Sequence, residues 1–132
     1  MRLLSSYPLL FLLLVLPIAG CGSSTPSNVD VTFRAVTFGD LGATEATISY
    51  VTPAGRQDLG VRPLPWTQTA TVAAGSTVRL EGATIDETGA GRVGFRIEIL
   101  ANGQLRESSE VEGAAGPTST AIASRAIEVT VP

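Results

Sequence analysis

Apolar and polar side chains alternate along most of the chain beyond residue 28, a pattern typical of half-buried β-strands. The clearest case is the run 92–100, in which Val93, Phe95, Ile97 and Ile99 share one face and mostly charged residues occupy the other. No segment of this region has the apolar spacing of an amphipathic helix. Runs of the same alternating kind cover residues 29–33, 44–52, 57–61, 67–72, 76–81, 104–112 and 126–131.

These runs predict an all-β domain over residues 29–132. About seven short strands separated by Gly and Pro turns are typical of an immunoglobulin-like β-sandwich. A small barrel is the alternative architecture, because it is also built from short strands and turns. In the first run the apolar phase changes at Val36 and Phe38, and this change predicts a β-bulge near Ala35.

The dipeptide Asn102-Gly103 separates two of the runs and predicts a β-hairpin. A two-residue loop would place Glu98 opposite Glu107, whereas a three-residue loop over 101–103 would place Glu98 opposite Arg106. Like charges that lie directly opposite each other cost energy, and opposite charges stabilise the pair. We therefore predict the three-residue loop, with Gly103 in the left-handed region as a bulge.

The first 20 residues have the organisation of a secretory signal peptide. Arg2 supplies the positive start, residues 9–16 form the apolar core, and small residues precede Cys21. A spanning helix needs about 20 predominantly apolar residues, far more than this unbroken run of eight. We therefore expect residues 1–20 to be removed. A membrane helix that is retained is the alternative.

Residues 18–21, Ile-Ala-Gly-Cys, resemble the lipobox of bacterial lipoproteins. The resemblance implies that the Cys21 thiol is diacylated, that the chain is cleaved before Cys21, and that the new amino terminus is acylated. The alternative is a chance cysteine at the end of an ordinary signal peptide. Acyl chains contribute about 0.8 kcal/mol per buried methylene, so two or three of them would give a stable anchor.

The small, polar residues of 21–28 predict a flexible tether between the anchor and the domain. Gly22 stands where an Asp would resemble an inner-membrane retention signal. By that analogy we expect the outer membrane, where the cell has one, and a domain on its periplasmic or extracellular side.

Composition argues against catalysis. All nine basic residues are Arg, the chain has no His, and Cys21 is its single Cys. Nucleophile systems that use an imidazole base, Schiff bases and phosphate-binding lysines are therefore excluded. The net charge of −3, without a basic run, argues against a nucleic-acid partner. We expect a protein that is not an enzyme and needs no cofactor or metal.

The segment Pro63-Leu64-Pro65-Trp66 is a candidate contact with a partner. Leu64 and Trp66 point to the same side of an extended chain, and Trp is favoured at binding hot spots. The alternative is that Trp66 fills one end of the core, because the chain has few large side chains.

Two groups of acidic residues are candidates for a metal site and for a catalytic carboxylate pair. Asp86-Glu87 in a Gly-rich loop would offer oxygen ligands to Ca²⁺, but a solvated loop is the alternative. Glu110 and Glu112 share a strand face, with Glu107 nearby, and paired carboxylates are what glycosidases need. The alternative is a solvated sheet face on which these residues form ion pairs with Arg92 and Arg96.

Four segments, taken in order, are similar to the mycobacterial membrane protein small (MmpS) family: Thr47–Tyr50, Leu64–Thr67, Val93–Ile97 and Asn102-Gly103. The resemblance implies an immunoglobulin-like sandwich outside the membrane that assists an exporter of lipids or siderophores and is not an enzyme. The family has an N-terminal membrane helix where this chain has a lipobox, and Phe95 holds the place of a family cysteine.

We therefore expect a lipid-anchored cell-envelope protein, an accessory or binding subunit of an envelope export complex. The alternative is a surface or periplasmic module that binds a carbohydrate, peptide or polymer. An accessory subunit predicts an exposed apolar patch or a free sheet edge, whereas a ligand-binding module predicts a concave pocket with a few polar groups.

Overall fold

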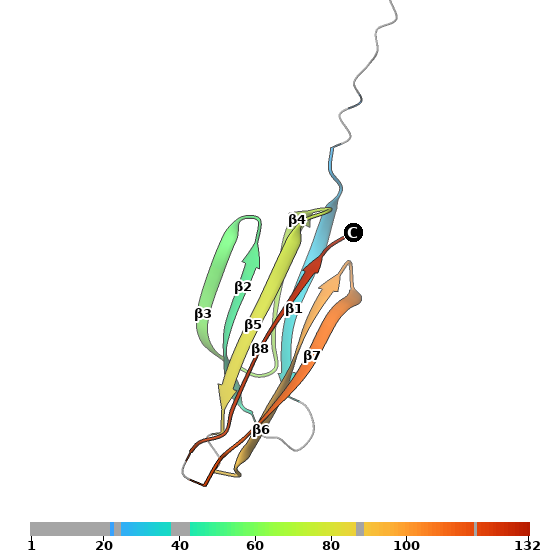
Figure 1. The fold of residues 1–132 in the computed structure, drawn as a ribbon. Coiled ribbons are helices and arrows are strands. Elements are labelled where there is room, and N and C mark those ends of the chain that lie inside the picture. Colours follow the sequence, from blue (N-terminus) through green and yellow to red (C-terminus); the bar gives the residue numbers. More distant parts are fainter. Residues whose placement is uncertain (1–21, 23–24, 38–42, 87–88, 118) are drawn as a thin grey trace, which may run out of the picture.

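A computed structural model describes residue 22 and residues 25–37, 43–86, 89–117 and 119–132 (Figure 1). Cys21 and the residues before it lie outside this part of the chain, as do Phe38 and Glu87. The described residues form strands and no helix. The strands are β1 (Asn28–Thr37), β2 (Glu45–Thr52), β3 (Gly55–Pro63), β4 (Trp66–Ala73), β5 (Thr77–Ile85), β6 (Arg92–Ala101), β7 (Gln104–Ala114) and β8 (Ile122–Thr130).

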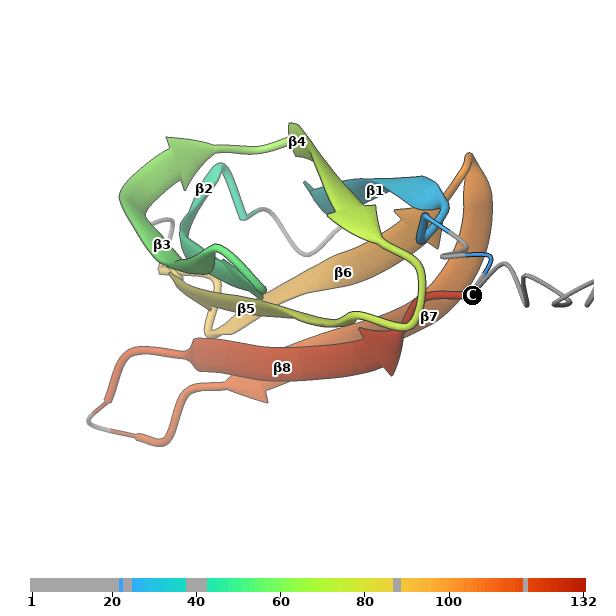
Figure 2. The same cartoon turned by 90° about the horizontal axis from the view of Figure 1, so that it is seen from above.

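The eight strands form two antiparallel sheets, with the orders β4-β1-β6-β7 and β3-β2-β5-β8. The sheets face each other, as the view from above shows (Figure 2). The predicted all-β sandwich is confirmed. It has the two-sheet architecture that immunoglobulin-like domains share. Its strand order is its own, since β1 lies between β4 and β6.

The core lies between the sheets and comes from the alternating apolar positions. Phe33, Ile48, Leu80, Phe95 and Ile97 are fully buried there. In β1 the buried positions continue in phase through Ala35, and the pairing of β1 with both neighbours is unbroken. The predicted bulge near Ala35 is therefore wrong, because Ala35 keeps the inward place and Val36 takes an outward one.

The hairpin between β6 and β7 differs from the predicted three-residue loop. Asn102 and Gly103 both have positive φ (49° and 77°), and Ala101 pairs with Gln104, so the loop has two residues. The register then shifts by one residue within β7, and Glu98 lies opposite Ser108. The like-charge pair with Glu107 is avoided by a bulge in the strand and not by a longer loop.

The two sides of the sandwich are closed by different contacts. On the β3–β4 side, the Tyr50 ring stacks on Phe33 at 4.8 Å between centroids and lies 6.5 Å from Trp66. On the β7–β8 side, Gly113 of β7 lies against the backbone of Ile122 in β8, so closely that a side chain there would overlap it. This contact brings the edges of the two sheets together.

Within the described ranges, no helix has the length and apolar character needed to span a bilayer.

Candidate binding face

The outer surface of the β3-β2-β5-β8 sheet, called the binding face below, carries a shallow hollow of about 760 Å³. Its floor is made of small residues because their register places them side by side. Thr47 pairs with Ala83, and Ala83 pairs with Ser124 on the next strand. Gly60 and Ala126 extend this floor towards either edge of the sheet. The floor of the hollow is thus a row of small residues that runs across all four strands.

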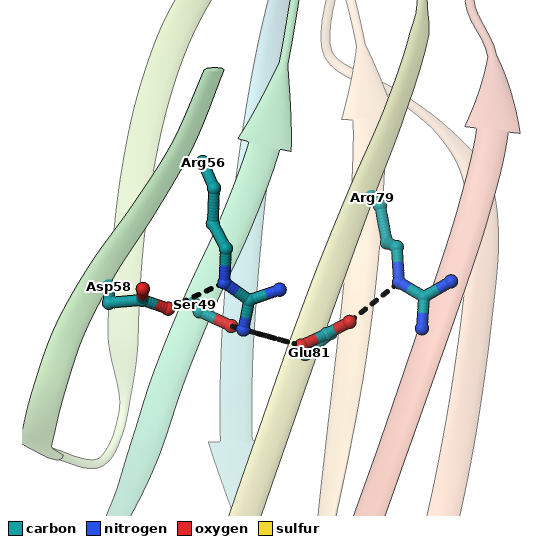
Figure 3. A network of polar contacts seen from close by, with 5 residues as sticks. All are labelled: Ser49, Arg56, Asp58, Arg79 and Glu81. Atoms are coloured by element: carbon teal, nitrogen blue, oxygen red, sulfur yellow. Dashed lines mark hydrogen bonds and ion pairs between the residues drawn. The ribbon is translucent and has the colours of Figure 1, made fainter.

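A polar network borders the hollow on the side nearer the start of β5 (Figure 3). Ser49 lies opposite both Asp58 and Glu81, so three strands bring these side chains together. Arg56 Nη2 donates to Glu81 Oε2 and to Ser49 Oγ, both at 2.8 Å, and Arg56 Nε lies 2.7 Å from Asp58 Oδ1. Arg79 Nε donates to Glu81 Oε1 at 2.7 Å. Two cations and two anions therefore balance each other.

The hydrogen bond from the Arg56 guanidinium is the largest influence on Glu81, and the hydrogen bond from Arg79 acts in the same direction. Together they outweigh the opposing effect of desolvation and lower the pKa of the Glu81 carboxyl below its ordinary value of 4.5. Hydrogen bonds to Glu81 and Asp58 raise the pKa of Arg56. Both shifts favour the charged forms, so Glu81 and Arg56 stay ionised at neutral pH.

Replacing Glu81 gives a loss of stability that depends on pH. A carboxyl with a lowered pKa in the folded state stabilises the fold above its unfolded pKa and loses this effect as the pH falls through the folded value. At pH 7 we expect Glu81→Gln to be less stable by under about 1 kcal/mol, since the network is partly exposed. Urea unfolding at pH 7 and pH 3 should show the gap closing at pH 3. A gap that is as large at pH 3 would contradict the ion-pair account.

The other end of the binding face is mostly apolar. Val61, Ile85 and Ile122 have exposed fractions of 56%, 50% and 61%, and Ile85 pairs directly with Ile122. These three side chains, with Ala83 and the carboxylate residue Glu45, border a notch of about 150 Å³ that adjoins the hollow. The face therefore changes from charged to small to apolar along the strands, and such an exposed apolar patch is typical of an interaction surface.

The candidate contact residues Leu64 and Trp66 lie away from this face. Both are half-buried and pack against the core at the turn from β3 to β4. The Leu64 N–H donates to the Thr44 carbonyl oxygen at 2.9 Å, which fixes the turn. Trp66 thus serves as a core side chain at one end of the sandwich, and a partner contact through its exposed part stays a prediction.

Trp66→Ala tests the packing role. Because this large, partly buried aromatic side chain packs against Tyr50 and the core, we expect a loss of about 2 kcal/mol in the free energy of unfolding. Urea denaturation followed by circular dichroism measures this. Unchanged stability would contradict the packing role.

Glu110 and Glu112 of β7 form ion pairs on the outer surface of the other sheet. Arg92 pairs with Glu112, and Arg96 Nη1 lies 3.4 Å from Glu110 Oε1. These are the predicted Arg–Glu pairs, and the two glutamates do not face each other across a cleft. Arg96 Nε also lies 2.8 Å from Oε1 of Glu98.

Asp86 differs from the predicted solvated loop residue. It is 8% exposed, and its Oδ2 accepts a hydrogen bond from the Gly91 N–H at 2.6 Å. Its own N–H donates to the Ala121 carbonyl oxygen. The carboxylate therefore stabilises the loop between β5 and β6 through this hydrogen bond. Among the described residues, no group of three acidic, His or Cys side chains could hold a metal ion.

Sequence reasoning did not find the binding face. The residues of its polar network lie up to 32 positions apart, and only the strand order brings Ser49 and Glu81 together. The detectable signal was the pair Ile85 and Ile122, two large apolar residues that lie outside the predicted strands.

No protein-family model matches the chain, and no curated protein matches its sequence.

Proposed function

We propose that the chain is a non-enzymatic, lipid-anchored protein of the cell envelope that binds another envelope component through the binding face. In this role it is an accessory or binding subunit of an envelope export complex, as its resemblance to the MmpS family implies. The observation that carries the proposal is the hollow flanked by a charged network and by Val61, Ile85 and Ile122 on a single sheet face.

The sequence of the N-terminus supports the anchor. A positive start, an apolar run and small residues precede Cys21, and a polar segment follows it. Acylation at Cys21 would hold the domain outside the cytoplasm, at the outer membrane where the cell has one. No nucleic-acid partner and no cofactor belong to this function.

The second candidate is a module that binds a soluble ligand, and the hollow with its polar border favours it. Among the described residues, those that line the hollow include no aromatic side chain. Sugar rings commonly stack on such side chains, so the hollow suits a peptide or another flexible polymer better than a carbohydrate.

Replacing the anchoring thiol tests the proposal. We expect Cys21→Ser to move the protein from the membrane fraction to the soluble fraction, because the acyl chains can no longer be attached. Fractionation and immunoblotting of the cells that make the protein measure this. The control variant Ser27→Ala changes the tether and keeps the thiol, so it should stay with the membrane. Equal partition of Cys21→Ser and the wild type would overturn the anchor.

A further inference from the structure

The apolar end of the binding face lies at the end of the sandwich remote from the tether. The Ala74 N–H, just before β5, donates to the carbonyl oxygen of Ser27, so β1 and β5 begin at the same end (Figure 1). Ile85 is the last residue of β5 and therefore lies at the other end. With the tether attached to a membrane, this patch lies at the end of the domain farther from the point of attachment.

The chain's own anchor does not cover the patch. The seven residue steps from Cys21 to Asn28 span at most about 25 Å when fully extended. The nine residues of β5 alone extend about 30 Å. An acylated Cys21 held in a bilayer thus leaves Ile85 and Ile122 free for a protein on the far side of the domain.

A second copy of the chain is also a poor match for the hollow. Two copies packed through this face would bring one concave surface against another. Their row of short side chains, Thr47, Ala83 and Ser124, would face the same row and leave a void, whereas stable interfaces are packed as densely as protein interiors. The occupant must be convex.

The dimensions of the face fit an α-helix. Its hollow runs across four strands, about 14 Å at the usual strand spacing, the length of about nine helical residues. Along β5 the hollow lies between Glu81 and Ile85, about 13 Å apart, and a helix with its side chains is about 10–12 Å wide. A single extended chain would fill less than half of that width.

Resting on the proposed function, we propose that the binding face docks an amphipathic helix of a second envelope protein. The helix lies across the strands, and apolar side chains on one of its flanks lie against Val61, Ile85 and Ile122. The small floor residues let the helix approach the sheet closely, and polar side chains on its other flank meet the network of Arg56 and Glu81. Helix-in-groove recognition of this kind reads apolar anchors spaced by three and four residues.

Photo-crosslinking in the membranes of the cells that make the protein tests this proposal. The full chain carries benzoylphenylalanine in place of Ser124, which is exposed in the hollow, or in place of Thr69, which is exposed on β4 of the other sheet. We expect a light-dependent adduct with one protein from position 124 and none from position 69. Mass spectrometry should place the crosslink in a segment with helical apolar spacing.

Charges in the patch provide the matched comparison. Ile85→Glu combined with Ile122→Glu should lower the adduct yield about tenfold or more, because charges would be buried against an apolar helix face. Leu105→Glu, at an equally exposed leucine of the other sheet, should leave it unchanged. Thermal unfolding confirms that each variant is folded.

The negative outcomes separate this proposal from the proposed function. A crosslink in a partner segment without helical spacing, or to a second copy, overturns the helix and leaves binding through this face intact. An adduct from position 69 alone overturns the binding face but leaves an envelope partner. The absence of any protein adduct from both positions overturns both proposals.

Discussion

Gly113→Ala should destabilise the domain by about 3 kcal/mol or more. A Cβ atom at this position would overlap the carbonyl group of Ile122 and lie 3.0 Å from the Ala123 nitrogen. Both are backbone groups of β8, and β8 is held by nine cross-strand pairs with β5, so a rotamer change cannot relieve the overlap. β7 and β8 must move apart, and the sandwich opens along that side.

Gly116→Ala is the matched control for this substitution. A Cβ at Gly116 would meet only the Ser119 hydroxyl, at 3.1 Å, and that side chain can rotate. Urea unfolding of both variants should give a large shift in midpoint for Gly113→Ala and a small one for Gly116→Ala. Similar midpoints would mean that β7 and β8 do not approach each other as described.

Gly82→Ala should cost about 1–3 kcal/mol through a clash inside the core. The added Cβ would lie 2.6 Å from Cε2 of Phe95 and 3.4 Å from Cγ2 of Ile97. Phe95 is fully buried between the sheets, so its ring can move only by displacing other core side chains.

A double-mutant cycle shows whether the clash is the cause. Phe95→Leu removes the ring edge that meets the new Cβ, so Gly82→Ala with Phe95→Leu should be more stable than the sum of the single changes predicts, by about 1 kcal/mol or more. Strict additivity of the two losses would rule out contact between these positions.

Period-two alternation was sufficient to predict the strands and the class of fold. The inward residues of β6, Val93, Phe95, Ile97 and Ile99, are all buried as expected. These residues alternate without interruption, and a strand buried on one face needs no information from distant residues. The ion pairs of Arg92 and Arg96 were also predictable from local sequence, because their strand, β6, is joined to the strand of their partners, β7, by a single tight turn.

The errors arose where two local effects compete. Charge repulsion between Glu98 and Glu107 argued for a longer loop, but Asn102-Gly103 strongly favours a two-residue turn with two positive φ angles. The chain satisfies both requirements with a bulge at Arg106, which neither pattern alone predicts. The change of phase at Val36 was misleading in a similar way, because an outward Val on a sheet surface needs no bulge.

The binding face could not be predicted because it depends on strand order. Arg56, Glu81 and Ser124 come from three strands whose neighbours are set by the packing of the whole sandwich. Only β2–β3 and β6–β7 are neighbours in both sequence and sheet. Local sequence patterns can therefore predict the pairing of strands only within those two hairpins.

The most direct test of the account is the mass of the N-terminal peptide of the protein purified from the membranes of the cells that make it. The account predicts a mature chain that begins at Cys21 and carries diacylglycerol on its thiol and a fatty acyl group on its amino nitrogen. A peptide that begins elsewhere, or an unmodified Cys21, would contradict it.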